Sequence, residues 1–400
     1  MLPAGSDATV WRVLAARGVR ALADGYMAVL LPAYLLALGL GTVEVGVLAT
    51  TTLLGSALAT IAVGAWGHRF AAGSLLRAMA WLMVATGVSF AGLASFWPLL
   101  VVAFVGTLNP SAGDVSAFLP LEHARIAASA AGPARTALFA RYSVIGALCA
   151  AVGALATGAP DWLEHHAGWS RLQAMRAMFA LYAVAGVAVW WLYRRGVPRM
   201  QAQTTPTAPL GPSRHIVVRL AALFSIDAFA GGLIVNSLMT LWLLQRFGLT
   251  LAQAGTFFFW TGALSAASQF AAPAVATRIG LLNTMVFTHI PANVCLILAA
   301  LSPNLPLALL LLSVRAALSQ MDVPTRSAYV MAVVTPAERP AAASFTAVPR
   351  SLAAALSPAL SGALLATGAL AAPLVLCGAL KIAYDLTLWR LCRRDTLGDG

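Results

Sequence analysis

Long stretches of this sequence contain no Asp, Glu, Lys or Arg. Among them are residues 25–43, 45–68, 78–113, 142–160, 177–193, 247–277, 279–314 and 351–380. A helix needs about 20 apolar residues to cross a bilayer, so the longest stretches hold one helix, a neutral turn and part of the next helix. Hydrophobic residues make up 60% of the chain and charged residues 10%, which is more apolar surface than a soluble domain buries. The pattern predicts an all-α membrane protein.

Twelve transmembrane helices fit these stretches. The expected spans are residues 16–39, 43–66, 74–95, 97–121, 136–158, 174–194, 217–245, 251–275, 281–301, 305–333, 342–367 and 371–391. A polar segment rich in Pro, Thr and Gln, VPRMQAQTTPTAPLGPSRH, follows the sixth helix and is typical of a flexible linker. We therefore expect an N-terminal six-helix bundle (1–196), a cytoplasmic linker (197–215) and a C-terminal six-helix bundle (216–400).

The two halves resemble each other in sequence. Residues 141–158 read RYSVIGALCAAVGALATG, and residues 350–368 read RSLAAALSPALSGALLATG. Further upstream, GDVSAF at 113–118 resembles MDVPTR at 321–326. Six helices, a linker and six related helices are the parallel-repeat plan of many secondary transporters. The sequence thus predicts two pseudo-symmetric bundles.

The net charge of +12 reflects the orientation of the predicted helices in the membrane. When both termini and the linker are placed in the cytoplasm, only Arg171, Arg176 and Arg246 of the 25 Lys and Arg residues fall on outer loops. This skew is the positive-inside pattern, and it predicts a multi-pass protein of a bacterial-type inner (plasma) membrane with both termini cytoplasmic. No basic patch with interleaved aromatic residues is present, so no nucleic-acid partner is expected.

Four aspartates lie within otherwise apolar segments: Asp24, Asp114, Asp227 and Asp322. A charged carboxylate in the middle of a membrane helix costs roughly 2.5–3.5 kcal/mol on insertion scales, so such residues usually have a function. We predict that Asp24 and Asp227 bind protons or substrate in a cavity, together with Asn236 further along the same predicted helix as Asp227. The alternatives are structural: an ion pair of Asp24 with Arg20 at i,i+4, and a hydrogen-bonded Asp227.

Two basic residues also lie inside predicted helices. Arg315 stays protonated and needs either a counter-charge or an anionic ligand, so it is a candidate for the proton-coupling or substrate cavity. Lys381 is the chain's one lysine, and Asp385 follows it at i+4. That spacing favours a local ion pair between the two.

Asp114 and Asp322 occupy matching places in the two halves. Each precedes an arginine by a similar interval: Arg141 follows Asp114, and Arg350 follows Asp322. We predict that these residues form symmetric gates on the cytoplasmic side. The alternative is that each aspartate is a polar anchor at the cytoplasmic end of its helix.

The loop after the second predicted helix carries a partial family signature. It keeps Gly64 and Arg69 of the pattern G-x-x-x-D-R-x-G-R-R/K, with His68 in the place of the aspartate, and Arg278 and Gly280 keep an R-x-G core at the equivalent turn of the second half. With the repeat and the six-plus-six plan, the chain resembles the major facilitator superfamily over nearly its whole length. That resemblance implies a twelve-helix transporter and a gating role for Arg69 on the cytoplasmic side.

These features predict a proton-coupled secondary active transporter that moves a small molecule or ion by alternating access, as a monomer in the lipid bilayer, with export favoured over import. The sequence shows no nucleotide-binding loop, metal-protease motif or nucleophile elbow, so we expect no enzyme activity, no cofactor and no bound metal. A divalent-metal transporter of the same fold is an alternative, because several carboxylates and His289 are possible ligands. A membrane receptor or scaffold that transports nothing is another.

Overall fold

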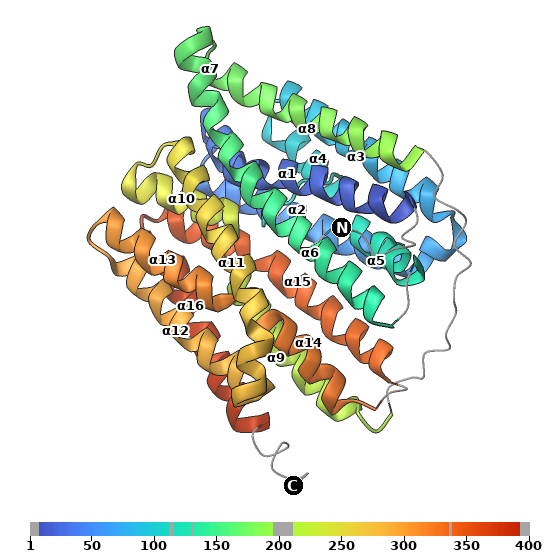
Figure 1. Cartoon of the computed structure of the whole chain (residues 1–400). Helices are drawn as coiled ribbons and strands as arrows, with labels where there is room; N and C mark the ends of the chain where they lie inside the picture. Colours follow the sequence, from blue (N-terminus) through green and yellow to red (C-terminus); the bar gives the residue numbers. More distant parts are fainter. Residues whose placement is uncertain (1–7, 112–115, 130–131, 195–210, 336–337, 393–400) are drawn as a thin grey trace. The chain divides into compact units, whose positions relative to one another are not determined.

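The structure is a computed structural model that describes residues 8–111, 116–129, 132–194, 211–335 and 338–392. All regular structure in these ranges is helical (Figure 1). The helices are α1 (Ala8–Ala37), α2 (Thr42–Trp66), η1 (Gly67–Arg69), α3 (Ala72–Gly92), α4 (Phe96–Val105), α5 (Phe118–Ser129), α6 (Gly132–Leu155), η2 (Ala156–Gly158), α7 (Ala159–Ala167), α8 (Arg171–Arg194), α9 (Arg214–Gly232), α10 (Asn236–Phe247), α11 (Leu251–Ile279), α12 (Leu281–Leu301), α13 (Leu305–Ser319), α14 (Asp322–Val333), α15 (Arg339–Ala366) and α16 (Ala372–Cys392).

Ten stretches of the described chain are long and apolar enough to cross a membrane. They include α9 with α10 as one stretch, and α13 with α14 as another. Two of the predicted spans, 97–121 and 251–275, are not among the ten. The first contains the short apolar helix α4, and the second lies in α11, whose 29 residues include several Thr, Ser and Gln side chains. The all-helical membrane architecture is therefore confirmed, with fewer clear spans than the twelve expected.

The prediction of one continuous helix over 97–121 is wrong. Helix α4 ends at Val105, and α5 begins at Phe118. Pro110 has no N–H to continue a helix, and the side chain of Asn109 accepts hydrogen bonds from the backbone and hydroxyl of Ser111 at 3.0 and 2.7 Å. These hydrogen bonds form a local turn that competes with the helical hydrogen bonds, so the backbone is not helical at this point.

Two other predicted helices, 217–245 and 305–333, are also interrupted. The first breaks after Gly232, where the N–H groups of Leu233 and Ile234 bond three residues back, to Ala230 and Gly231. The second breaks at Gln320, and α14 starts again two residues before Pro324. Proline is tolerated in the first turn of a helix, where its missing N–H leaves no bond unmade. Apolar composition did not reveal these breaks, because the segments on both sides are hydrophobic.

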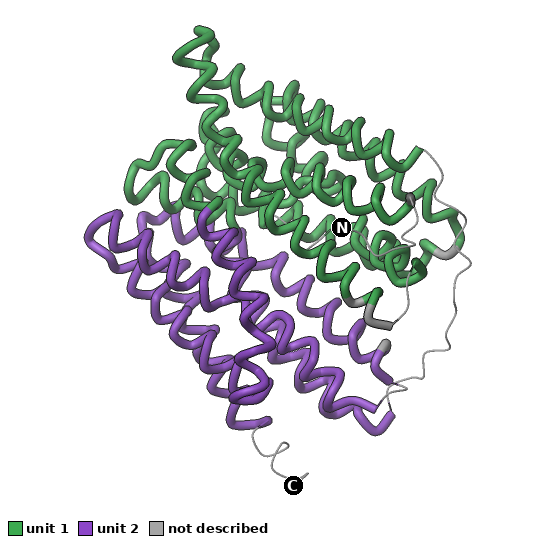
Figure 2. The backbone as a smooth tube through the Cα atoms, viewed as in Figure 1, with its two compact units in different colours: residues 1–203, 236–259 green, residues 204–235, 260–400 purple. Residues whose placement is uncertain are grey.

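The chain forms two compact units (Figure 2). One contains residues 1–203 and 236–259, and the other contains residues 204–235 and 260–400. Helix α10 and the first turns of α11 thus pack within the first unit, although they follow the linker in the sequence. The division of the sequence into 1–196, 197–215 and 216–400 remains a prediction from the repeat and the linker.

Each unit has a core built from five helices at matching places in the chain. In the first unit the core side chains come from α1, α3, α5, α6 and α8. In the second they come mainly from α9, α12, α14 and α16, with one contribution from α15. Helix α1 packs on α6 and α3 on α8, while α9 packs on α15 and α12 on α16. The same helix pairs therefore hold each unit together.

Glycine allows the closest of these helix contacts. An added Cβ on Gly25 of α1 would lie 2.1 Å from the backbone oxygen of Ala150 on α6, and one on Gly153 of α6 would lie 2.0 Å from the oxygen of Leu22. In the second unit, a Cβ on Gly232 would lie 2.3 Å from the oxygen of Ala354. Small residues that bring backbones together are the usual basis of helix packing in membranes, where hydrophobic burial between helices is weak.

We expect Gly153→Ala to destabilise the first unit by about 1–3 kcal/mol, because the new methyl group forces α1 and α6 apart. The measurement is thermal unfolding of the purified protein. Gly92→Ala is the matched control, because it adds the same methyl group where nothing lies within 4 Å. Equal unfolding temperatures for the two variants would contradict the close contact.

Candidate functional site

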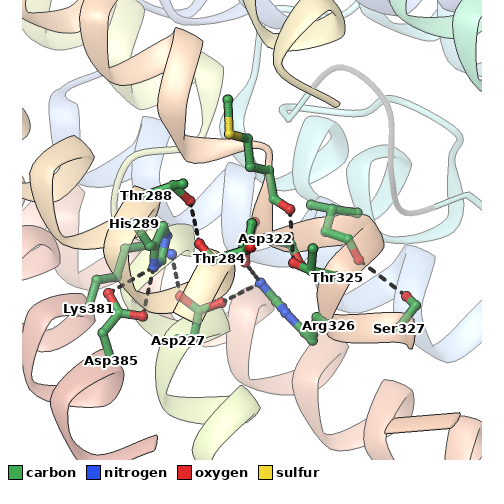
Figure 3. A network of polar contacts seen from close by, with 12 residues as sticks. Asp227, Thr284, Thr288, His289, Asp322, Thr325, Arg326, Ser327, Lys381 and Asp385 are labelled. Atoms are coloured by element: carbon green, nitrogen blue, oxygen red, sulfur yellow. Dashed lines mark hydrogen bonds and ion pairs between the residues drawn. The ribbon is translucent and has the colours of Figure 1, made fainter. Parts of the chain in front are cut away.

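A cluster of six charged or titratable side chains lies in the second unit (Figure 3). They come from four helices: Asp227 of α9, His289 of α12, Asp322 and Arg326 of α14, and Lys381 and Asp385 of α16. All six are buried. Buried charges at membrane depth are stable only when they are paired, so the contacts within this cluster decide what it can do.

Asp227 is the centre of the cluster. One carboxylate oxygen accepts a hydrogen bond from Nζ of Lys381 at 2.5 Å, and the other lies 3.2 Å from Nη2 of Arg326. Arg326 also forms an ion pair with Asp322, one helical turn earlier on α14. Arg326 therefore bridges two aspartates, and Asp227 bridges two cations. The charge-assisted bonds link α9, α14 and α16.

The predicted local pair of Lys381 with Asp385 is wrong. Lys381 bonds to Asp227 on another helix, and Asp385 pairs with His289, whose Nδ1 lies 3.0 and 3.1 Å from the two carboxylate oxygens. His289 must carry its proton on Nδ1 to donate this bond. The i,i+4 spacing makes a local pair possible, but tertiary packing brings in partners 154 and 96 residues away.

The charges of this cluster balance only with one additional proton. Three carboxylates face two basic side chains, Arg326 and Lys381, and the imidazole of His289. With a neutral imidazole the cluster carries one net negative charge, and with a protonated imidazole it is neutral.

A second buried polar cluster lies in the first unit, around a glutamate that the sequence analysis did not single out. Glu122 of α5 accepts bonds from Nη2 of Arg20 at 2.5 Å, from the hydroxyl of Tyr142 at 2.5 Å and from the hydroxyl of Tyr193. Its carboxylate thus joins α1, α5, α6 and α8. The partners lie 102, 20 and 71 residues away, so no local spacing could have indicated them.

Asp24 lies one turn beyond Arg20 on α1. It is only 7% exposed, and the described part of the chain gives its carboxylate no hydrogen bond or ion pair. Arg17 and Arg20 act on it at longer range, but the near partner of Arg20 is Glu122. Asp24 is therefore a buried carboxylate that lacks a direct partner.

Arg315 and Asn236 belong to different units. Arg315 is half-buried on α13, and its Nε is buried without a hydrogen-bond partner in the described ranges. Asn236 is the first residue of α10 and belongs to the unit that contains Asp24. The grouping of Asp24, Asp227, Arg315 and Asn236 in one cavity stays a prediction.

The expected gating residues that the structure describes lie on four elements of the two units. Arg69 is exposed at the end of η1, Arg141 is half-buried on α6, and Arg350 is exposed on α15. In the described chain the ion-pair partner of Asp322 is Arg326 on its own helix, α14, in place of the predicted Arg350. Asp114 lies outside the described residues, so its pairing with Arg141 stays a prediction.

Glu338, at the start of α15 and outside the membrane-spanning stretch that begins at Ala341, joins the end of the linker to the second unit. Its carboxylate accepts bonds from the backbone N–H groups of Gly211 and Ser213 and from the hydroxyl of Thr335 at 2.7 Å. These hydrogen bonds to Ser213, Thr335 and Gly211 lower the pKa of Glu338 from 4.5 to about 2.

Since the pKa of Glu338 is lower in the folded protein, its stabilising effect is complete above the unfolded pKa and is lost as the pH falls from about 4.5 towards about 2. We expect Glu338→Gln to lower the unfolding temperature at pH 7, and we expect the difference from wild type to narrow steadily below the unfolded pKa. The control is Glu164→Gln, which changes an exposed glutamate on α7. A difference that is constant across this pH range would exclude a role for the ionised carboxylate.

The apolar helices and buried charge clusters define a multi-pass membrane protein, and comparison with known proteins gives its family. The family model of the Major Facilitator Superfamily matches residues 13–314, so the chain belongs to this superfamily of transporters. It is 24% identical over 410 residues to YJR124C, an uncharacterized membrane protein of Saccharomyces cerevisiae, with 92% of this chain and 91% of the yeast protein covered.

Solved structures of transporters share the fold. A D-xylose–proton symporter superposes with a TM-score of 0.74 at 15% identity, covering 96% of each chain. A bacterial homolog of the human lysosomal transporter Spinster, in an inward-facing and occupied conformation, superposes with a TM-score of 0.72 at 16% identity, again covering 96% of each chain. At these identities the similarity establishes the fold and leaves the substrate open.

Proposed function

We propose that this protein is a proton-coupled secondary active transporter of a small solute. The fold is that of the Major Facilitator Superfamily. The observation that supports proton coupling is that the buried carboxylate of Asp24 has no direct partner in the described chain. Among the buried carboxylates of the described membrane helices, Glu122, Asp227, Asp322 and Asp385 each have a direct partner, and Asp24 has none. A carboxylate in that position avoids the cost of an unpaired charge by binding a proton.

The sequence analysis named Asp24 and Asp227 together as coupling candidates, and the geometry leads us to favour Asp24. Two cations hold Asp227 in its ionised form, so releasing it for protonation would break both contacts. Protonation of Asp24 breaks no contact.

In this proposal, protonation of Asp24 changes the relative stability of two conformations in an alternating-access cycle. If the proton binds one conformation more tightly than the other, it shifts the population towards that conformation, and the size of the shift is set by the ratio of the two proton affinities. The arginine distribution supports cytoplasmic termini. Three further statements remain predictions from the sequence: export as the direction of transport, a monomeric state and a bacterial-type plasma membrane. A D-xylose–proton symporter of the same fold is named as proton-coupled, which is consistent with this mechanism.

The test uses purified protein in proteoliposomes and a solute identified by thermal-shift screening. An imposed pH gradient should drive accumulation of that solute in wild-type vesicles. Asp24→Asn should abolish gradient-driven accumulation while retaining counterflow at equal pH, because the amide mimics the neutral acid. Full gradient-driven accumulation by Asp24→Asn would overturn the assignment of Asp24, and the absence of counterflow for any binding solute would overturn transport itself.

A further inference from the structure

Arg315 differs from Arg326 and Lys381, two other basic residues inside described membrane helices of the second unit. Arg326 and Lys381 each form an ion pair with an aspartate. For Arg315, the described residues supply neither an ion pair nor a hydrogen bond, and its Nε is buried. Because a guanidinium stays protonated at any physiological pH, this helix carries a permanent positive charge with no protein counter-charge in contact.

The position of Arg315 argues against a solvated surface residue. It lies ten residues after the start of α13 at Leu305, which is about 15 Å along a helix and so close to the middle of a bilayer core about 30 Å thick. It is next to the packed face of α13 that contains the buried Leu312 and Ala316, and away from Leu310 and Val314, which are 60% and 41% exposed. Arg315 therefore lies at the edge of the buried face of α13.

Polar groups on α16 and α11 lie around Arg315. The thiol of Cys377 on α16 is the titratable group within its electrostatic range, and Lys381 and Asp227 act on the same thiol. On α11, the hydroxyl of Ser265 bonds to the backbone oxygen of Ala316, next to Arg315. Three residues later, the hydroxyl of Ser268 is buried without a partner in the described chain, although buried hydroxyls nearly always have one. The Nε of Arg315 and the hydroxyl of Ser268 thus both lack acceptors in the described chain.

We infer that Arg315 is the anchor of a substrate site for an organic anion, whose carboxylate or phosphate group supplies the acceptors that its guanidinium lacks. The inference rests on the proposed transport function and names its substrate class. A planar guanidinium binds a carboxylate or phosphate through two parallel hydrogen bonds.

Binding is tested with purified protein in nanodiscs at constant pH, so that no proton gradient is involved. The probes are size-matched pairs of an anion and its neutral analogue: benzoate with benzamide, succinate with succinamide, and glucose 6-phosphate with glucose. At least one anion is expected to raise the unfolding temperature while its neutral analogue does not. Arg315→Gln should weaken the apparent affinity for that anion roughly tenfold to hundredfold, as expected for charge-assisted hydrogen bonds.

Arg278→Gln is the matched control, because it removes an exposed arginine at the end of α11 and should leave anion binding unchanged. Ligand-free stability gives an independent measurement: Arg315→Leu should raise the unfolding temperature, since it removes an uncompensated charge. The inference is overturned if neutral analogues stabilise the protein as much as the anions, if no anion shifts the unfolding temperature, or if Arg315→Leu lowers it as the loss of an ion pair would.

These outcomes separate the inference from the proposed function. Counterflow of a neutral solute, with no binding of the anions, would leave the transporter assignment in place and remove the anion site. Binding of an anion that depends on Arg315, without counterflow of that anion, would retain the site and remove the transporter assignment.

Discussion

Asp227→Asn is expected to destabilise the protein by about 3–5 kcal/mol, because it leaves two buried cations without their shared counter-charge. Lys381 loses its one ion-pair partner, and Arg326 keeps only Asp322. The variant should show a much lower unfolding temperature and a reduced yield of folded protein. Thermal unfolding in nanodiscs, followed by tryptophan fluorescence, measures the effect.

A second substitution shows whether charge is the cause. Combining Asp227→Asn with Lys381→Met removes both charges of the closest pair, and the double variant should be more stable than Asp227→Asn alone. Coupling between neighbouring positions of this kind is measured by a double-mutant cycle. Asp161→Asn on α7 is the control for loss of a carboxylate outside the cluster. Additive effects of the two substitutions would mean that the bond between Asp227 and Lys381 contributes nothing.

Glu122→Gln should have an effect of similar size in the first unit, about 3–5 kcal/mol, because it leaves Arg20 buried and unpaired. Glutamine keeps the shape of glutamate and one oxygen acceptor for Tyr142 and Tyr193, so the loss is mainly that of the charge. The expected result is a large fall in the unfolding temperature of the purified variant. Glu44→Gln, at the start of α2, is the matched control for the same chemical change.

Arg20→Met in the Glu122→Gln background should restore part of the lost stability, since no uncompensated charge remains at Arg20. Phenylalanine at Tyr142 should cost much less than Glu122→Gln, because it removes one neutral donor and leaves the Arg20–Glu122 ion pair in place. If Tyr142→Phe and Glu122→Gln lower the unfolding temperature equally, the ion pair is not the main contribution of this cluster.

Much of the fold follows from periodicity and composition. The errors in the predicted helix boundaries share one cause. Charge-free stretches located the membrane helices, but they did not reveal the breaks at Asn109–Pro110, Gly232 and Gln320. A break between two apolar segments leaves hydropathy unchanged, and it depends on local backbone chemistry such as the side-chain bond of Asn109. The matching helix pairs of the two units agree with the repeat seen in the sequence.

The candidate site was less accessible to sequence reasoning. Sequence composition correctly marked Asp24, Asp227, Asp322, Arg315 and Lys381 as unusual, because charge is rare in such segments. It gave wrong partners for Lys381 and Asp322, because i,i+4 spacing and repeat symmetry were the available guides. Glu122 was missed as a site residue because it lies among other charged residues near the end of a predicted helix, where a carboxylate is common.

The sequence by itself determined that this chain is a helical membrane protein with a duplicated plan and charges inside its membrane helices. The length of an apolar stretch and the presence of a charged residue within it are properties of the local sequence. Only the tertiary structure decided which of those charges are neutralised. Asp227 is held between Lys381 and Arg326, whereas Asp24 and Arg315 have no direct partner in the described chain. Ion pairing depends on which helices meet, and contacts between residues 154 positions apart are fixed by packing rather than by local sequence.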